Sequence, residues 1–213
     1  MSEMPALRRI GVNVEALSRP ARTFTGDFYF THRRGERLWF AQGDVAGKGL
    51  PAAVVMAMIQ EELEQRIVRC ANTACDPAAT TRRIDEFLRP LLPSNRFATA
   101  VIGHLHDDGR LTIVNAGHCP PLILRKDGRI ETIPSTGPLL GILPNAKWRS
   151  YKTHLDFGET LVLYSDGLVE AQVNGDELGV DGLRNRISAD HPGKILDHLD
   201  EVNDDLTLVV IRR

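Results

Sequence analysis

The second half of the chain is divided by short glycine-containing turns, and this pattern constrains the fold more than any other feature. Apolar runs lie on both sides of each turn, and an Asp-Gly or Gly-containing turn between two such runs predicts a β-hairpin. The turns are at residues 107–110, 126–129 and 156–159, between runs at 98–106 and 111–115, 122–125 and 130–133, and 148–155 and 160–165. Because consecutive hairpins form antiparallel sheets, we expect three hairpins here.

The first half combines short strands with two helices. Apolar residues recur every three or four positions over 51–67, which predicts an amphipathic helix. Asp76-Pro77 is typical of a second helix start, with aspartate as the cap and proline in the first turn. We expect strands at 10–16, 24–30, 37–42 and 206–212, a turn at 31–36 and a weakly helical stretch at 181–199. This order predicts a layered α+β fold.

Composition excludes several classes of protein. Apolar residues make up 42% and charged residues 25% of the 213 residues, as in globular proteins. The net charge of −2 argues against nucleic-acid binding, which needs clustered positive charge. The longest mostly apolar run, residues 50–59, is about half of a membrane span. With no apolar leader at the start, we expect a cytoplasmic protein that binds no membrane.

Two further expectations follow from the spacing of special residues. Cys70, Cys75 and Cys119 form no disulfide framework and no CxxC motif, so we expect three reduced thiols and no structural zinc. Neither a low-complexity linker nor an internal repeat interrupts the chain. Residues 1–213 are therefore expected to form a single domain.

Several aspartates share one context, the end of an apolar strand beside a glycine or a polar loop. They are Asp27, Asp44, Asp166, Asp204 and Asp205. Any one of them, taken alone, is most simply a turn residue whose side chain bonds its own backbone. Asp204 and Asp205 are adjacent, and strand alternation sends their side chains to opposite faces, so we expect at most one of them to bind a given ion.

The segment that contains Asp44 favours a binding role. Gly43-Asp44-Val45-Ala46-Gly47-Lys48-Gly49 leads directly into the helix at 51–67. Glycines allow close approach of a ligand to the backbone, and a helix N-terminus attracts anions. Such a loop can hold a cation and a phosphate side by side. The nucleotide-binding patterns GxxxxGK[ST] and GxGxxG are both absent.

These segments, taken in order, resemble the motifs of a known family. The matching stretches are 26–29 (GDFY), 43–53 (GDVAGKGLPAA), 115–122 (NAGHCPPL), 137–141 (GPLLG), 164–171 (YSDGLVEA) and 204–210 (DDLTLVV). The ordered set is similar to bacterial PPM-type serine/threonine phosphatases, in the branch of sporulation stage II protein E and sigma-factor regulators. The resemblance extends over about residues 10–213.

The resemblance implies a fold and a metal site. The fold would be an α-β-β-α sandwich of two antiparallel sheets. Two Mn²⁺ or Mg²⁺ ions would lie at one end, bridged by Asp44, with the carbonyl of Val45 and the carboxylate of Asp27 as further ligands. Asp166 and Asp204 would bind the other ion, and Asp205 remains open as a replacement for Asp204. The ions would activate the water that attacks phosphorus, so no nucleophilic side chain is needed.

The resemblance also implies a substrate and leaves some positions open. The implied activity is hydrolysis of phosphoserine or phosphothreonine on a bacterial signalling protein, either an antagonist of an anti-sigma factor or a stress-signalling scaffold. Phe30 replaces a second aspartate of the family, and Lys48 replaces a histidine. Lys48 is a candidate phosphate contact or a solvated loop residue, and Arg22 is the nearest arginine that could hold the phosphate. A weakly catalytic, partner-binding module and a small-molecule phosphomonoesterase remain alternatives.

Overall fold

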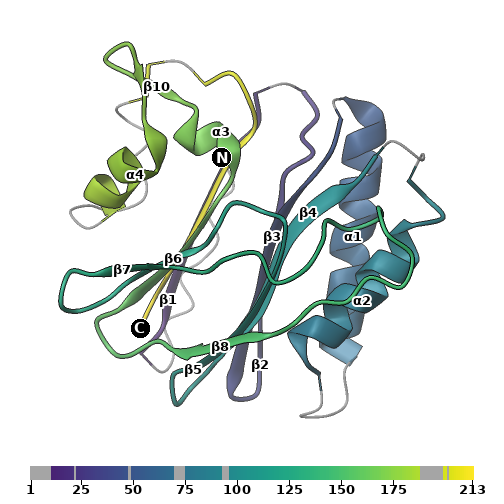
Figure 1. Cartoon of the computed structure of the whole chain (residues 1–213), viewed down its shortest axis with the longest axis horizontal. Coiled ribbons are helices and arrows are strands. Elements are labelled where there is room, and N and C mark those ends of the chain that lie inside the picture. Colours follow the sequence, from purple (N-terminus) through teal and green to yellow (C-terminus); the bar gives the residue numbers. More distant parts are fainter. Residues whose placement is uncertain are drawn as a thin grey trace.

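Two five-stranded antiparallel sheets lie face to face, with helices on both outer sides (Figure 1). This computed structural model describes residues 11–21, 23–47, 49–69, 75–92, 96–187, 199–200 and 202–213. The α-β-β-α arrangement implied by the family resemblance is confirmed.

Each sheet combines strands that are distant in sequence. One sheet has the order β2-β3-β4-β5-β8, with β2 at Phe28–Arg34, β3 at Arg37–Val45, β4 at Ala98–His106, β5 at Arg110–Ala116 and β8 at Tyr151–His154. The other has the order β1-β12-β9-β6-β7, with β1 at Asn13–Arg19, β12 at Leu206–Arg212, β9 at Thr160–Tyr164, β6 at Leu122–Leu124 and β7 at Ile130–Thr132. A small ribbon pairs β10 (Gln172–Val173) with β11 (Asp176–Glu177).

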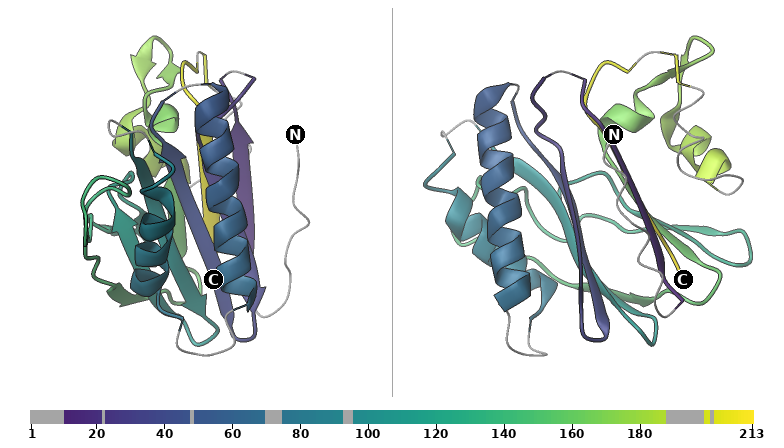
Figure 2. Two further views of the ribbon diagram at one scale, coloured as in Figure 1. Left: turned by 90° about the vertical axis from the view of Figure 1, so that its right-hand side faces the viewer. Right: turned by 180° about the vertical axis from the view of Figure 1, so that it is seen from behind.

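In the described part of the chain, helices cover the two outer faces. The helices α1 (Leu50–Arg69) and α2 (Pro77–Leu88) pack on the sheet that contains β3, whereas α3 (Asp166–Val169) and α4 (Gly179–Ile187) lie by the other sheet. Figure 2 shows these groups on opposite sides of the sandwich. Asp76 caps α2, since its carboxylate accepts hydrogen bonds from the amides of Ala78 and Ala79, so the predicted helix start is confirmed.

Alternation along the strands explains the layering. On β12, Leu208 and Val210 pack under α3 and α4, while Val209 and Ile211 face the core between the sheets. The same two-residue period divides the other long strands, because successive side chains point to opposite faces. Each sheet is apolar on both sides, so it has to be covered on both sides, and four layers result.

The turn at 156–159 is not a hairpin, so that prediction is wrong. The first two predicted hairpins are confirmed as β4–β5 and β6–β7. The strands on either side of 156–159, β8 and β9, belong to different sheets. The turn therefore carries the chain from one sheet to the other. A hairpin and a connection between two sheets both need a tight turn. They differ only in whether the two strands beside the turn pair with each other.

Smaller differences concern boundaries and one cysteine. The strand expected at 24–30 begins only at Phe28, and its turn is shorter than 31–36, because β2 and β3 pair as far as Arg34 and Arg37. The late helix begins at Gly179, before the expected 181. Cys119 is free as expected, but Cys75 is disulfide-bonded, so the expectation of three reduced thiols is wrong. In the described ranges, no helix is both long and apolar enough to cross a membrane.

Candidate metal centre

Asp44 is held at the end of β3, where the chain leaves the sheet. It is paired in register with Thr99 of β4. Gly26 lies so close that an added Cβ would be 2.6 Å from Asp44 Oδ1 and 2.9 Å from the carbonyl oxygen of Val45. The backbone of Val45 also donates a 3.3 Å hydrogen bond to the carbonyl of Gly26. The side-chain oxygen of Asp44 and the carbonyl oxygen of Val45 thus face a space that only a glycine at position 26 leaves open.

Asp27 reaches the same region from the neighbouring strand. It immediately precedes β2, whose first residue, Phe28, is paired with Gly43 next to Asp44. The Asp27 side chain is buried, with 5% of the residue exposed. Its Oδ2 accepts a 2.7 Å hydrogen bond from the hydroxyl of Thr207, which fixes the carboxylate in place.

The second sheet supplies Asp166 and Asp204. Asp166 is the first residue of α3, directly after β9, and Asp204 lies two residues before β12. Because Tyr164 of β9 is paired with Leu208 of β12, the two strand ends lie at the same edge. At Gly167 an added Cβ would be 2.2 Å from the carbonyl oxygen of Asp205, so glycine permits the close contact between these two loops.

The strand ends of the two sheets enclose one acidic pocket of about 120 Å³. It contains every predicted acidic ligand, together with Asp205, and none of the described lining residues is basic. Phe24, with 46% of its surface exposed, forms an apolar part of the rim. The lining residues are Ala21, Phe24, Gly26, Asp27, Asp44, Gly47, Asp166, Asn203, Asp204 and Asp205.

Burial and mutual repulsion disfavour the charged form of these carboxylates. Burial, with a further contribution from the Asp44 charge, raises the pKa of Asp27 to about 8. Burial raises the pKa of Asp44 to about 6, and the charges of Asp166 and Asp204 act in the same direction. Since a divalent cation would remove this repulsion, the electrostatics of the pocket match a site for cations.

Asp204 and Asp205 have different roles in the local structure. Both oxygens of Asp205 accept backbone hydrogen bonds from the β1–β2 loop, from the amide of Ala21 at 2.8 Å and from that of Gly26 at 3.1 Å. Asp205 thus fastens that loop to the start of β12. Asp204 Oδ1 accepts from the amide of Asp205. Both oxygens of the Asp205 carboxylate are therefore already engaged by backbone amides.

The pocket fits divalent cations in donor chemistry and in charge. Hard cations such as Mg²⁺ and Mn²⁺ prefer carboxylate and carbonyl oxygens, which the loops present here. Within the part of the chain that the structure describes, however, no three acidic, histidine or cysteine side chains lie close enough to hold one ion. Binding of one ion by three of these carboxylates would require the side chains to lie closer together than they do here.

The structure describes only some of the other positions that the sequence analysis singled out. Lys48 and Arg22 lie outside the described residues. Phe30 lies on β2 and packs against the core beneath α1, in the place of the family's second aspartate. The residues that sequence reasoning missed are Phe24 at the rim and Thr207 behind Asp27. Thr207 follows the Asp204-Asp205 motif directly, which is the one sequence signal that could have identified it.

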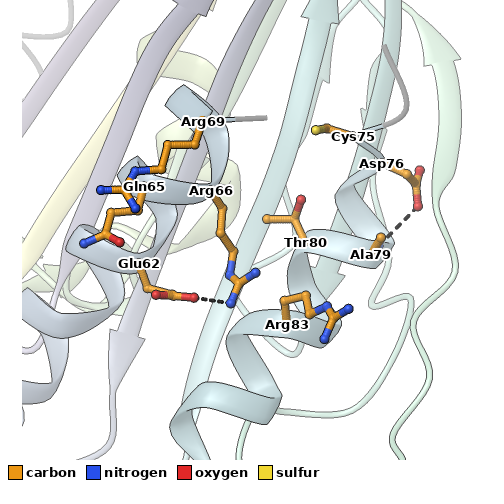
Figure 3. Close-up of a pocket in the computed structure, with 9 residues that line it drawn as sticks. All are labelled: Glu62, Gln65, Arg66, Arg69, Cys75, Asp76, Ala79, Thr80 and Arg83. Atoms are coloured by element: carbon orange, nitrogen blue, oxygen red, sulfur yellow. Dashed lines mark hydrogen bonds and ion pairs between the residues drawn. The ribbon is translucent and has the colours of Figure 1, made fainter. Parts of the chain in front are cut away.

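A larger cavity of about 460 Å³ lies between α1 and α2 (Figure 3). Its charges are largely engaged within the protein. Arg66 is ion-paired with Glu62, Arg83 with Glu86, and Asp76 caps α2. Since two of its three arginines already have acidic partners, this cavity does not have the excess of charge of one sign that the acidic pocket has.

Comparisons with known proteins agree with this arrangement. The phosphoserine phosphatase RsbU of Bacillus subtilis is 28% identical over 216 residues, which cover 95% of this chain and 63% of RsbU. The RsbU and RsbW domains of Rv1364c from Mycobacterium tuberculosis superpose with a TM-score of 0.80 at 26% identity, over 100% of this chain and 62% of that one. RsbX, crystallised with magnesium, gives a TM-score of 0.77 at 17% identity, over 97% of this chain and 98% of that one, which is a likeness of fold.

The chain covers less than two thirds of the curated relatives it matches. The sequence model of the stage II sporulation protein E family matches residues 34–213, which include every predicted metal ligand except Asp27. The chain therefore belongs to the stage II sporulation protein E (SpoIIE) family.

Proposed function

We propose that residues 1–213 act as one PPM-type domain, a metal-dependent phosphatase that hydrolyses phosphoserine or phosphothreonine on a regulatory protein. The observation that carries the proposal is the meeting of Asp27, Asp44, Asp166 and Asp204 in one pocket. The named activity of RsbU, a phosphoserine phosphatase, supports the reaction class.

Asp27, Asp44, Asp166, Asp204 and the carbonyl of Val45 would hold two Mn²⁺ or Mg²⁺ ions. When bound, such ions supply a nucleophilic water at neutral pH and neutralise charge on the phosphoryl oxygens. The charge of Asp44 interacts with those of Asp27, Asp166 and Asp204, so Asp44 is the carboxylate that both ions would share. Thr207 orients Asp27 by a hydrogen bond, and Gly26 keeps the space in front of Asp44 and Val45 open.

The shape of the pocket favours a protein substrate over a small metabolite. Sites for small molecules usually enclose about 300–1,000 Å³, whereas this pocket has about 120 Å³. It can admit the phosphorylated end of a side chain, with the exposed Phe24 at the rim to contact the surrounding peptide. The substrate that we propose is a phosphorylated antagonist of an anti-sigma factor or a stress-signalling scaffold, and both kinds of protein place the enzyme in the cytoplasm.

Hydrolysis of p-nitrophenyl phosphate with and without Mn²⁺ tests the reaction, and a panel of phosphorylated regulator domains tests the substrate. We expect hydrolysis that depends on Mn²⁺ or Mg²⁺ and is lost in Asp166→Asn. A protein that binds a regulator domain and shows no metal-dependent turnover would instead be the weakly catalytic, partner-binding module.

A further inference from the structure

A phosphate group that enters the acidic pocket needs positive charge from the protein as well as from ions. The described lining residues include five aspartates and no basic side chain. A phosphorylated side chain carries nearly two negative charges at neutral pH, so repulsion by any carboxylate that is not bound to an ion would weaken its binding. A cation at the edge of the pocket would offset that repulsion.

Arg96 lies against the loop that follows Asp44. An added Cβ at Gly47 would be 2.3 Å from Nη1 of Arg96 and 2.8 Å from its Cζ, so the guanidinium rests directly on Gly47. Gly47 itself lines the acidic pocket. Its φ of 117° is accessible mainly to glycine. Gly47, which carries no side chain, thus lies between the guanidinium of Arg96 and the acidic pocket.

The backbone that directly follows Arg96 is held by two other segments of the chain. The carbonyl of Phe97 accepts a 2.9 Å hydrogen bond from the amide of Ala46, which ties this segment to the Asp44 loop. Ala98 forms two hydrogen bonds with Leu140, at 2.8 and 3.1 Å. A side chain that starts from such a fixed segment loses less conformational freedom when it binds a ligand.

Most of the hydrogen-bonding capacity of Arg96 is not used by the residues that the structure describes. Nη1 donates to the carbonyl of Ala46 at 3.5 Å, which is long for a hydrogen bond. Among the residues that the structure describes, no carboxylate forms an ion pair with Arg96. A guanidinium carries five N–H donors in a planar fork that matches phosphate oxygens. We propose that Arg96 is a phosphate-binding residue of this site and donates to the phosphoryl oxygens of the substrate.

This inference rests on the proposed function, and its test separates the two. The kinetics of p-nitrophenyl phosphate hydrolysis and inhibition by inorganic phosphate are measured with saturating Mn²⁺ for the wild type, Arg96→Ala and Arg96→Lys. Arg129→Ala is the matched control, since this arginine is 81% exposed and its ion-pair partner among the described residues is Asp127 of the β6–β7 turn. Melting temperatures (Tm) are recorded with Mn²⁺ alone and with Mn²⁺ plus inorganic phosphate.

In Arg96→Ala we expect KM and the inhibition constant of phosphate to rise about 10- to 100-fold, the range of a charge-assisted hydrogen bond. Arg96→Lys keeps the positive charge but lacks the planar set of N–H donors. Its KM and its inhibition constant for phosphate should therefore lie between those of the wild type and those of Arg96→Ala. The Mn²⁺-induced rise in Tm should be unchanged. If Arg96 only fastens the Asp44 loop, Tm and the response to Mn²⁺ will fall in Arg96→Ala while KM and phosphate inhibition stay the same, and the proposal is overturned.

Two further outcomes also give an answer. If Arg96→Ala fails to fold, the comparison of Arg96→Lys with the wild type decides by the same constants. If the wild type hydrolyses nothing, the proposed function fails. The role of Arg96 is then decided by whether phosphate raises the Tm of the wild type and not that of the variant.

Discussion

Thr207 donates a 2.7 Å hydrogen bond from its hydroxyl to Oδ2 of Asp27, across 180 positions of sequence. The backbone of Thr207 is held equally firmly. Its amide donates a 2.8 Å hydrogen bond to the hydroxyl oxygen of Ser165, and its carbonyl accepts one of 3.1 Å from the side-chain amide of Gln42. Gln42 belongs to the opposite sheet, so this buried polar group joins both sheets directly beneath the acidic pocket.

Replacement of Thr207 by valine should weaken metal binding with little change of shape. Valine has nearly the same size and no hydroxyl, so one buried oxygen of Asp27 would lose its donor, at about 1–3 kcal/mol. We expect a lower melting temperature and a Mn²⁺ titration shifted to higher concentration. Thr207→Ser restores the donor and should recover most of both. Equal Mn²⁺ affinity in the valine variant and the wild type would show that Thr207 does not position Asp27.

Replacement of Asp44 by asparagine should separate stability from function. Without metal, the charged Asp44 is disfavoured by burial and by its acidic neighbours, so Asp44→Asn should be at least as stable as the wild type in EDTA at pH 8. The wild type should gain melting temperature with millimolar Mn²⁺ because binding to the native state stabilises it. The variant should lose this gain and all hydrolysis of p-nitrophenyl phosphate. An undiminished Mn²⁺ response would remove Asp44 from the ligand set.

The metal-free protein should lose stability as pH rises from about 6.5 to 8. Burial raises the pKa of Asp27 from 3.8 to about 8, so in this range the native state keeps a proton that the unfolded chain has released. Stability then falls with pH, by about 1 kcal/mol per unit for one proton. Burial lowers the pKa of His104 and His118 from 6.5 to about 4, so these residues act in the opposite direction while the unfolded histidines lose their protons around pH 6.5. Their contribution is the same in the wild type and in Asp27→Asn.

Urea unfolding in EDTA at several pH values measures this slope, with Asp27→Asn as the comparison. The asparagine variant has no proton to retain, and its stability should change less between pH 6.5 and 8. Parallel pH profiles for the two proteins would mean that Asp27 is ionised in the folded state throughout this range.

The sequence predicted local structure well where the neighbouring residues determine it. Asp76 caps α2 because a carboxylate before a proline suits a helix start, and the turns after His106 and Arg125 close hairpins. The turn at 156–159 has the same local features but joins two sheets. The strand β9 pairs with β12, which lies far along the chain, and no pattern in the residues near the turn indicates this pairing.

The candidate site likewise has parts that the sequence predicted and parts that it did not. The acidic ligands were predicted because each lies in a short motif, and their convergence was implied by the family. The contacts of Thr207 with Asp27 and of Arg96 with Gly47 join segments that are distant in sequence, and no local pattern predicts either contact. The role of Asp205 in holding the β1–β2 loop likewise became apparent only from the two amides that donate to its carboxylate.

Asp85 should matter for stability and little for metal binding. It is buried in α2, with 2% of its side chain exposed, and accepts a 2.8 Å hydrogen bond from the amide of Gly141. It also pairs with Arg89 at 3.2 Å. Asp85→Ala leaves this amide and the partly buried Arg89 without their partner, so we expect a loss of about 2–4 kcal/mol in unfolding free energy.

Glu86→Ala is the matched control for Asp85→Ala, because Glu86 is the next residue of α2 and forms only exposed pairs with Arg82 and Arg83. Exposed pairs of this kind contribute about 0–1 kcal/mol. Chemical denaturation of both variants, together with the Mn²⁺-induced shift in melting temperature, tests the prediction. Because Asp85 fastens the loop at Gly141 and lies outside the acidic pocket, the Mn²⁺-induced shift should persist in the folded fraction of Asp85→Ala. A lost shift would mean that the Gly141 loop also holds the metal centre in place.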